Sequence, residues 1–158
     1  MSTTPPVRMP EADDQSEWLR LRLELWPECP SDQQELEMGT VLADADRAAV
    51  FVSPAAAGGL AGFVEIALRS WHEGCAGSPV GKVEALYVAP TSRDQGVGAA
   101  LLTAAEAWAE SRGCRSIAAD AALDNDAGRA LHRRLGYEET GVRVRMRKNL
   151  APRAGGAR

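Results

Sequence analysis

Residues 82–102 read KVEALYVAPTSRDQGVGAALL, and this stretch decides the fold. Its first part is rich in β-branched and aromatic residues, which predicts a buried strand over 83–88. Pro90 ends that strand, because proline cannot extend a central ladder. An apolar stripe at helical spacing begins at Val97, so a glycine-bearing turn connects a strand to a helix N-terminus.

The turn before Val97 has the features of an anion site. The first N–H groups of a helix have no internal partner and carry the positive end of its dipole, which suits a phosphate or pyrophosphate. Gly96 and Gly98 let a ligand approach the backbone with no Cβ in the way. The turn is not a P-loop, because no lysine follows Gly98, and Leu101 replaces the third glycine of the dinucleotide fingerprint.

Length and composition indicate one soluble domain. The chain has 158 residues, of which 45% are hydrophobic, and it contains no run of about 18 apolar residues that would span a membrane. Its first residues lack a basic region followed by an apolar one, so no signal peptide is expected. Cys29, Cys75 and Cys114 are odd in number and widely spaced, so we expect reduced thiols in a cytoplasmic protein.

Charge and histidine content argue against a nucleic-acid partner and a metal site. The net charge of -4 disfavours nucleic acid and is compatible with a cationic substrate. His72 and His132 lie far apart, so no metal site is expected. No membrane partner is expected either.

The rest of the chain predicts alternating strands and helices in a mixed α/β sheet. One helix is expected over 13–26, and a second starts near Pro30 with Ser31 or Asp32 as N-cap and Glu35 as capping-box partner. A third runs from Val97 to near Gly113, a fourth spans 126–135, and 70–79 form a loop of a length often used for binding. Strands are expected over 7–9, 48–53, 60–69, 83–88, 115–120 and, as one or two strands, 137–146.

These elements predict a single domain over 1–150. The polar, glycine-rich tail 151–158 is expected to be disordered.

Two motifs resemble those of the GCN5-related N-acetyltransferases. The loop Arg93-x-x-Gly96-x-Gly98 is similar to their acetyl-CoA pyrophosphate loop, and Asn125-x-x-Gly128-x-x-Leu131-His132-x-x-Leu135-Gly136-Tyr137 is similar to their second motif. Markers spread from about residue 18 to residue 150 resemble, more narrowly, the aminoglycoside 6'-N-acetyltransferases. They include Leu25-Trp26-Pro27, Gly74-Cys75, Ser78-Pro79-Val80, Glu84 before Tyr87-Val88, Trp108, Gly113-Cys114, Asp120 and Leu135-Gly136-Tyr137.

The resemblance implies a fold, a reaction and an assembly. The fold would be a mixed central sheet flanked by about four helices, with a splayed central strand pair. The reaction would be direct acetyl transfer from acetyl-CoA, without a metal, to the 6'-amine of a polycationic aminoglycoside, which confers antibiotic resistance. A homodimer is expected on the resemblance alone.

The donor site would be built largely from backbone. The strand over 84–88 would pair with the pantetheine arm as an added strand, with a local bulge that opens the sheet. The N–H of residue 86 or 87 would polarise the acetyl carbonyl. The resemblance implies these cofactor-binding residues: Leu86, Tyr87, Val88, Arg93, Gln95, Gly96, Val97, Gly98, Ala99 and Asn125.

Three side chains are candidates for proton transfer. An alkylammonium has a pKa of about 10.4, so the attacking amine must lose a proton, which a carboxylate or a water held by one can take. Glu84 and Asp120 are the candidates; each could instead bind substrate ammonium groups or form a structural salt bridge. His132 stands where many acetyltransferases have a tyrosine acid, and it is either the acid for the leaving thiolate or a packed structural residue.

Aromatic and acidic side chains are the candidates for acceptor binding, because sugars and cations pack on aromatic faces. Trp18 and Trp108 fit apolar helical stripes and are assigned to the core. The predicted acceptor-binding residues are Trp26, Trp71, His72, Glu84, Asp120 and Glu139.

Other functions remain open at this level. The same superfamily fold can acetylate a polyamine or a protein N-terminal amine, and a non-catalytic acyl-CoA-binding module would keep the loop but not need Glu84 or Asp120. A pure interaction protein would not need the Arg93-x-x-Gly96-x-Gly98 loop at all, and Gly98→Val would then leave its function intact.

Overall fold

The computed structural model describes residues 3–151 and follows the predicted element order over most of that range. Of the predicted tail 151–158, only Ala151 lies within the described residues. The elements are η1 (Ala12–Asp14), α1 (Gln15–Leu25), α2 (Ser31–Ala43), β1 (Ala48–Pro54), β2 (Leu60–Arg69), β3 (Val80–Val88), η2 (Pro90–Ser92), α3 (Val97–Ser111), β4 (Ile117–Ala118) and α4 (Asp126–Arg134).

The strands form one mixed sheet in the order β1-β2-β3-β4. The pairs β1–β2 and β2–β3 are antiparallel, and β3–β4 is parallel. The hairpin predicted between the two strands after residue 48 is confirmed, since β1 and β2 are joined by a short turn. The mixed α/β architecture is therefore as expected.

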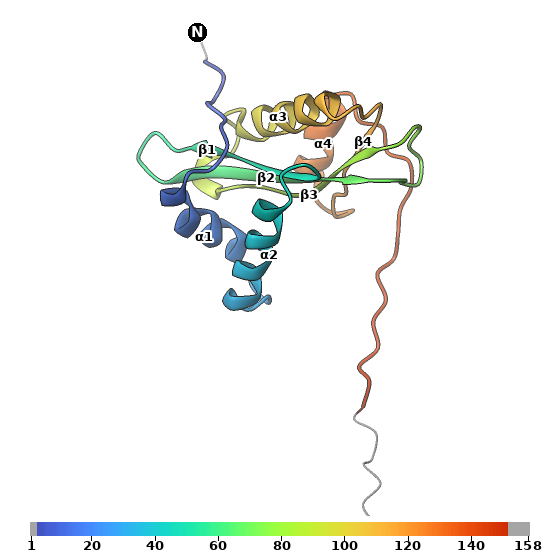
Figure 1. The fold of residues 1–158 in the computed structure, drawn as a ribbon, viewed down its shortest axis with the longest axis horizontal. Helices are drawn as coiled ribbons and strands as arrows, with labels where there is room; N and C mark the ends of the chain where they lie inside the picture. Colours follow the sequence, from blue (N-terminus) through green and yellow to red (C-terminus); the bar gives the residue numbers. More distant parts are fainter. Residues whose placement is uncertain (1–2, 152–158) are drawn as a thin grey trace, which may run out of the picture.

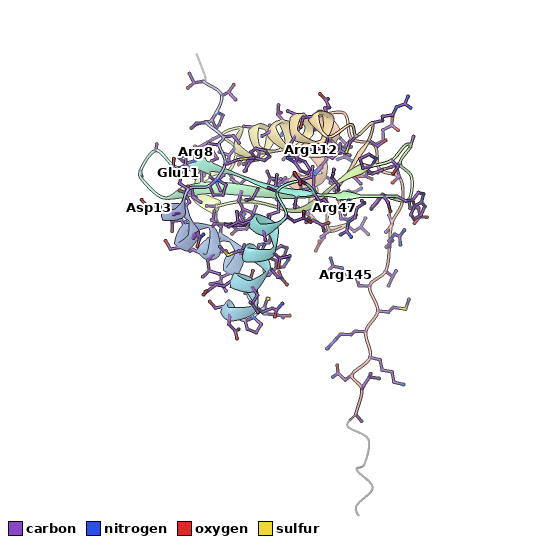
Figure 2. All side chains as sticks on the ribbon, in the orientation of Figure 1. Arg8, Glu11, Asp13, Arg47, Arg112 and Arg145 are labelled. Atoms are coloured by element: carbon purple, nitrogen blue, oxygen red, sulfur yellow. The ribbon has the colours of Figure 1, made fainter. Side chains whose placement is uncertain are left out.

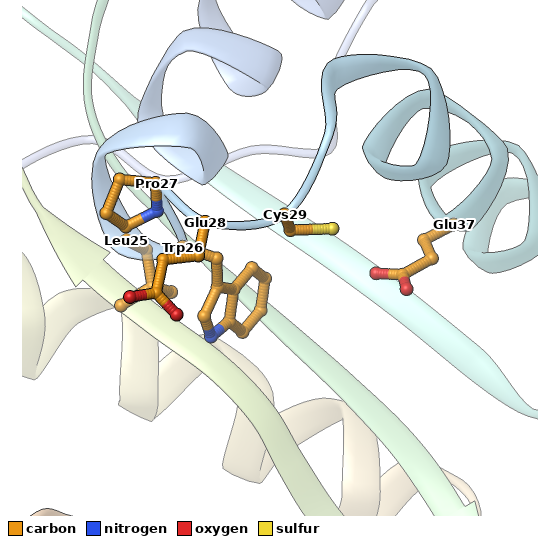
Figure 3. Close-up of a pocket in the computed structure, with 6 residues that line it drawn as sticks. All are labelled: Leu25, Trp26, Pro27, Glu28, Cys29 and Glu37. Atoms are coloured by element: carbon orange, nitrogen blue, oxygen red, sulfur yellow. The ribbon is translucent and has the colours of Figure 1, made fainter. Parts of the chain in front are cut away.

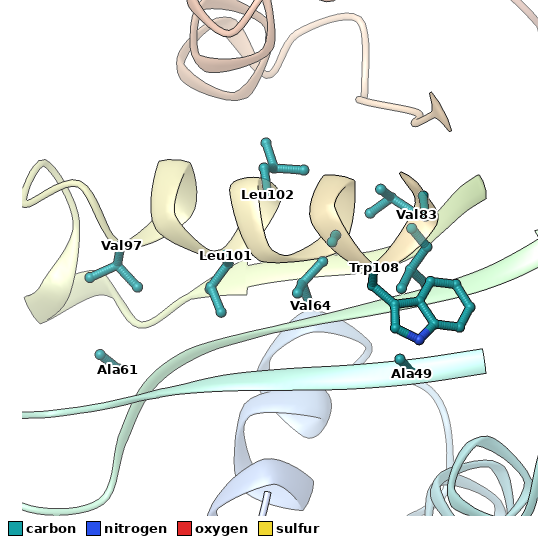
Figure 4. Close-up of a cluster of buried hydrophobic side chains, with 11 residues drawn as sticks. Ala49, Ala61, Val64, Val83, Val97, Leu101, Leu102 and Trp108 are labelled. Atoms are coloured by element: carbon teal, nitrogen blue, oxygen red, sulfur yellow. The ribbon is translucent and has the colours of Figure 1, made fainter. Parts of the chain in front are cut away.

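Helices cover both faces of the sheet (Figure 1): α1 and α2 lie on one face, and α3 and α4 on the other. On the α3 side, Leu101 and Trp108 pack on the strands (Figure 4). On the other side, Trp18 of α1 is fully buried with Phe63 of β2. The assignment of Trp18 and Trp108 to the core is confirmed, and no helix among the described residues is long and apolar enough to cross a membrane.

Three predicted details near the helices and sheet edges are wrong or shortened. The predicted cap of α2 by Ser31 or Asp32 is wrong: Pro30 is the N-cap residue, no side chain caps the helix, and Asp32 instead accepts from the N–H of Gln33 at 2.9 Å. The strand expected over 7–9 is reduced to one bridge between Arg8 and Val52. The strand expected over 115–120 is reduced to the two residues of β4.

The strands predicted over 137–146 are absent from the described chain. Residues 141–150 are all exposed and extend away from the sheet (Figures 1 and 2), and Arg145 is labelled on this segment. The exposed fractions of Val142, Val144 and Met146 are 72%, 81% and 91%. Their alternation with arginines has the period of a strand, but a strand forms only where a neighbouring strand pairs with it.

Candidate active site

The turn before α3 leaves helix N–H groups without partners. Gly96 is the N-cap residue with φ 83°, a left-handed conformation that glycine adopts without strain, and no side chain caps the helix. The first intrahelical bond runs from the N–H of Ala100 to the carbonyl of Gly96, at 3.0 Å. Within the described residues, the N–H groups of Val97, Gly98 and Ala99 therefore have no acceptor, which is the arrangement that binds phosphate.

Gly98 has a second reason to be glycine. A Cβ at this position would lie 2.9 Å from Cδ2 of Leu131, so α3 and α4 approach each other here more closely than an alanine allows without a shift. A Gly98→Val substitution would disturb packing as well as any ligand. It therefore does not separate an acyl-CoA site from an interaction surface.

Arg93 fastens the loop to the end of β3. Its Nε donates to the carbonyl of Val88 at 3.0 Å, and its guanidinium lies 5.6 Å from the centroid of the Tyr87 ring. Gln95 donates within the loop to the carbonyl of Thr91 at 3.5 Å. Both side chains thus shape the turn that presents the N–H groups.

The central strands separate next to this turn. β3 runs to Val88, yet it pairs with β4 only at Gly81 and Lys82. Beyond Lys82, no strand of the described chain lies beside that edge of β3, so Leu86 and Tyr87 lie in the open part. The predicted splayed pair is confirmed, and the open edge has the form that accepts an extended ligand as an added strand.

Glu84 is the extra residue of a bulge in β3. Glu65 of β2 pairs with Ala85, whereas the next residue, Ile66, pairs with Val83, so Glu84 has no residue opposite it. The bulge predicted in this strand is therefore present. Bulges redirect a side chain, and here the redirected side chain is a carboxylate at the start of the splay.

A surface ion pair holds the Glu84 carboxylate. Arg69 Nη2 donates to Glu84 Oε1 at 2.5 Å, and the two side chains are 53% and 36% exposed. Exposed pairs of this kind contribute little free energy. Glu84 can therefore exchange Arg69 for another cation at small cost in free energy.

Asp120 pairs with a cation that is itself buried, since the Lys82 side chain is only 10% exposed. Lys82 Nζ donates to Asp120 Oδ2 at 2.6 Å, from the position where β3 and β4 last pair. This hydrogen bond holds the pKa of Asp120 below its usual range, with smaller contributions from the charges of Lys82, His72 and Arg145. A carboxylate with a lowered pKa is a weak base and a good ammonium ligand, so Asp120 suits binding better than proton abstraction.

His132 lies on α4 with one ring nitrogen bound and one free. Nδ1 is 2.7 Å from the carbonyl of Gly128, which can only accept, so Nδ1 carries the proton. Nε2 is buried without a partner in the described chain, and the ring meets Tyr137 edge-on at 5.1 Å. With Nδ1–H fixed in this way, Nε2 can donate only from the imidazolium form.

Two further candidates have local partners. Asn125 caps α4, since its Oδ1 accepts from the N–H of Gly128 at 3.0 Å. Glu139 pairs with Arg129 at 2.8 Å and Arg133 at 3.6 Å, and the hydrogen bond from Arg129 lowers the pKa of Glu139. These contacts give both residues structural roles and leave their predicted ligand contacts as predictions.

A pocket of about 540 Å³ lies at the junction of α1 and α2 (Figure 3), lined by Leu25, Trp26, Pro27, Glu28, Cys29 and Glu37. It brings an indole face together with two carboxylates, which suits a ring that carries ammonium groups. Trp71 and His72 do not line it: Trp71 is 70% exposed, and the charge of His72 acts on Asp120.

Several charged residues at the site give no signal in the sequence. Lys82 is one, because a lysine in a strand looks solvent-exposed, yet it is only 8% exposed. Arg22 and Glu65 are two more, because they are 43 residues apart in the chain and meet only in the fold. Burial raises the pKa of Glu65, and Arg22 and Trp18 oppose that rise.

Comparison with known proteins identifies relatives along nearly the whole chain. Residues 14–137 match the model of the Acetyltransferase (GNAT) family. The aminoglycoside N(6')-acetyltransferase type 1 of Stenotrophomonas maltophilia is 40% identical over 155 residues, 98% of this chain and 99% of the relative. The protein of the same name from Klebsiella aerogenes is 38% identical over 152 residues, 95% of this chain and 100% of the relative.

Solved structures show the same similarity in three dimensions. Aminoglycoside acetyltransferase AAC(6')-Iy, in complex with the bisubstrate analog CoA-S-monomethyl-acetylneamine, has a TM-score of 0.83 at 32% identity, covering 94% of this chain and 100% of that one. AAC(6')-IG from Acinetobacter haemolyticus has a TM-score of 0.79 at 32% identity, covering 92% and 99%. The chain belongs to the GNAT family of acetyltransferases.

Proposed function

We propose that this protein transfers the acetyl group of acetyl-CoA to the 6'-amine of aminoglycosides. The observation that carries the proposal is the meeting of three features at one place: the unpaired N–H groups at the start of α3, the open edge of β3, and the bulged Glu84. The acceptor is supported by the relatives named aminoglycoside N(6')-acetyltransferase, which match along nearly their full length.

The donor side fits acetyl-CoA. The N–H groups of Val97, Gly98 and Ala99 would hold the pyrophosphate, because no protein acceptor in the described chain uses them. The backbone of Leu86 to Val88 would pair with the pantetheine arm, with an N–H of Leu86 or Tyr87 toward the acetyl oxygen. Acetyl-CoA supplies an activated thioester, so no metal is needed.

The two carboxylates take different roles in this proposal. Glu84 accepts a proton from the substrate ammonium, directly or through water, and the freed nitrogen attacks the thioester carbonyl. A C–N bond forms, the nitrogen loses its second proton to solvent, the C–S bond breaks, and the thiolate is protonated by solvent or by His132 in its imidazolium form. Asp120 stays ionised because Lys82 lowers its pKa, and it orients a second ammonium group of the acceptor.

The acceptor would lie between the splay and the α1–α2 junction. Trp26 would present its indole face to a sugar ring, and Glu28 and Glu37 add negative charge in the same pocket. Trp71 and His72 on the loop over 70–79 and Glu139 after α4 are further candidates for its outer rings. The cationic acceptor matches a protein of net charge -4.

The deciding experiment measures CoA release over aminoglycosides with a 6'-amine and matched ones with a 6'-hydroxyl. Turnover confined to the 6'-amines supports the proposal. Turnover with polyamines or peptide N-termini instead would identify an acetyltransferase of the same superfamily that acts on a different amine. Tight acetyl-CoA binding without turnover of any amine would identify a binding module.

We also propose a cytoplasmic homodimer. Cys29, Cys75 and Cys114 are unpaired, which suits a reducing compartment. The exposed arm 141–150 carries apolar side chains at strand period, and β4 is the last strand in the sheet order of the described chain, so its outer edge is open. All 22 acidic residues precede this arm, whereas the arm holds four basic residues. Shape and charge therefore favour pairing of the arm with the sheet of a second copy.

The dimer is tested by sedimentation. Wild type is expected at twice the chain mass, and Val144→Asp in the arm is expected to be monomeric because it places a charge in the paired face. Leu36→Asp is the control, since Leu36 is 68% exposed on α2, far from the arm in sequence. A monomeric wild type would contradict the homodimer.

A further inference from the structure

Arg22 is a buried arginine whose contacts reach both walls of the α1–α2 pocket. It lies on α1 and is 1% exposed. Its guanidinium lies 4.8 Å from the centroid of the Trp26 ring, and its Nη2 donates to Glu37 Oε2 at 2.6 Å. Both partners line the pocket, one at the end of α1 and the other on α2 (Figure 3).

Two other contacts fix Arg22 to the body of the protein. Its Nη1 donates to both carboxylate oxygens of Glu65, a buried residue of β2, and its Nε donates to Gln34 Oε1 at 2.9 Å. Gln34 in turn donates to the carbonyl of Trp26 at 3.1 Å, so the backbone and the ring of Trp26 belong to one network. Trp18 Nε1 donates to Glu65 at 3.3 Å and completes it.

We propose that Arg22 is a positioning residue for the acceptor: fixed by Glu65 and Gln34, it holds the Trp26 indole and the Glu37 carboxylate as the walls that receive a ring bearing ammonium groups. The inference rests on the proposed function only for the identity of the acceptor. In this role Arg22, Glu65 and Gln34 set the affinity for the acceptor without touching the reacting atoms.

The chemistry of arginine explains why this residue type, and not lysine, suits position 22. A guanidinium offers five N–H donors in a rigid plane and still presents a face to an aromatic ring, whereas an ammonium is a point charge with three donors. Here the one guanidinium donates to three carboxylate or amide groups and also lies over one indole ring. Lysine cannot satisfy all four positions at once.

Stability alone does not require a charged pair here. Buried ion pairs are often no more stabilising than well-packed apolar side chains of similar volume, because both charges lose water. The network instead connects parts of the site: Glu65 pairs across the sheet with Ala85, next to the bulged Glu84. It thereby joins the pocket to the strand that carries the candidate base.

The test compares Arg22→Lys with Arg20→Lys. Arg20 lies on the same helix and also bridges two glutamates, Glu17 at 2.6 Å and Glu24 at 2.9 Å, but it does not line the pocket. For Arg22→Lys we expect the KM for a 6'-amino aminoglycoside to rise about tenfold, equivalent to the loss of one or two positioned contacts, with the KM for acetyl-CoA unchanged. Arg20→Lys should change neither constant.

A second variant guards against loss of folding. The double substitution Arg22→Met with Glu65→Gln removes both buried charges together and keeps an oxygen at residue 65 that can accept from Trp18 Nε1, so a folded protein with near wild-type Tm is expected. It too should raise only the acceptor KM. If both KM values rise together with a fall in Tm, or if the acceptor KM is unchanged in a folded variant, the positioning role is wrong.

A measurement without any acceptor separates this inference from the proposed function. The indole N–H signal of Trp26 in the ¹H–¹⁵N spectrum, assigned with Trp26→Phe, should shift or broaden in Arg22→Lys, while that of the exposed Trp71 stays in place. If wild type turns over no aminoglycoside but the Trp26 signal responds, the acceptor is wrong and the positioning role stands. An unchanged Trp26 signal overturns the positioning role.

Discussion

The proposed donor half and the proposed acceptor half of the site are built by different means. In the donor half, β3, the turn and α3 are consecutive in sequence, and the groups offered to a ligand are backbone N–H groups. In the acceptor half, the key side chains come from α1, α2, β2, β3 and the segment that follows β4, and ion pairs hold them in place.

Because of this difference, the two halves should tolerate different substitutions. A backbone cradle depends on conformation and close approach, so it tolerates changes of side chain and is sensitive at a few glycines. A set of buried and half-buried ion pairs depends on every partner, so it is sensitive at charged residues far apart in the chain. Substitutions in the two halves should therefore give separable kinetic effects.

The largest effect is expected where the halves meet, at Glu84. Glu84→Gln should lower kcat by about 100-fold, because removal of a general base typically costs at least that much. Steady-state kinetics at saturating acetyl-CoA measures the change. Arg69→Gln is the control, since it breaks the ion pair but leaves the carboxylate; equal losses in both variants would show that only the ion pair matters.

The next largest effect concerns close approach in the donor half. A Cβ at Gly62 would lie 2.6 Å from the Tyr87 carbonyl and 3.3 Å from Cα of Val88, and backbone cannot move aside as a side-chain end can. Gly62→Ala should lower the free energy of unfolding by about 2 kcal/mol, a typical cost of overpacking. Denaturant unfolding measures it.

Gly98→Ala is the control for Gly62→Ala, and the quantity compared is the loss of free energy of unfolding. Its close neighbour is the end of the Leu131 side chain, which can rotate away, so the loss should be smaller. A larger loss at Gly98 than at Gly62 would contradict the view that backbone approach limits this half.

A smaller effect isolates the phosphate turn. Gly96 and Gly113 have the same φ of 83° and lie at opposite ends of α3, and a Cβ at either position would meet no described atom closer than 3.8 Å. Alanine at either position should cost about 1 kcal/mol of stability through left-handed strain. Only Gly96→Ala should also raise the KM for acetyl-CoA, by about tenfold, since it displaces the N–H groups of the cradle. Equal KM values for the two variants would argue against a phosphate site there.

The smallest effect distinguishes the roles of Glu84 and Asp120 by the pH dependence of kcat/KM. The pKa of Asp120 is below its usual range, so the group is ionised throughout a range of about pH 5.5 to 9. Asp120→Asn should raise the acceptor KM several-fold and leave the shape of the pH profile of kcat/KM unchanged. Loss of the acidic limb in this variant would instead make Asp120 the base.

The lowered pKa of Asp120 also makes its contribution to folding stability depend on pH. A carboxyl with a lowered pKa in the folded state stabilises the protein above its unfolded pKa, and this contribution disappears as pH falls through the folded value. Any stability advantage of wild type over Asp120→Asn should therefore decline below about pH 4 and vanish below the folded pKa. The pair is largely exposed on the Asp120 side, so the advantage is small.

Sequence predicts the donor half well because its signals are local. A β-branched run, a proline, two glycines and a helical stripe lie within 21 consecutive residues, and the expected strand, splay and bulge are all present. What sequence does not show is that Gly98 also makes room for Leu131, because that contact joins two helices.

The acceptor half and the C-terminal segment are harder to predict for a physical reason. The pairs Arg22–Glu65 and Lys82–Asp120 join residues 43 and 38 positions apart, and nothing in either local pattern names the partner. The alternation over 137–146 has strand period but does not say which edge it pairs with, and no strand forms there within the described chain. Pairing is a property of tertiary structure in both cases.

The most direct test of the central claim is the position of the acetyl group on the product. Wild-type protein, acetyl-CoA and an aminoglycoside with several amines are incubated, and the product is analysed by mass spectrometry and two-dimensional NMR. One added acetyl group is expected, on the 6' nitrogen. An acetyl group on any other nitrogen, or CoA release without an acetylated product, would contradict the central claim.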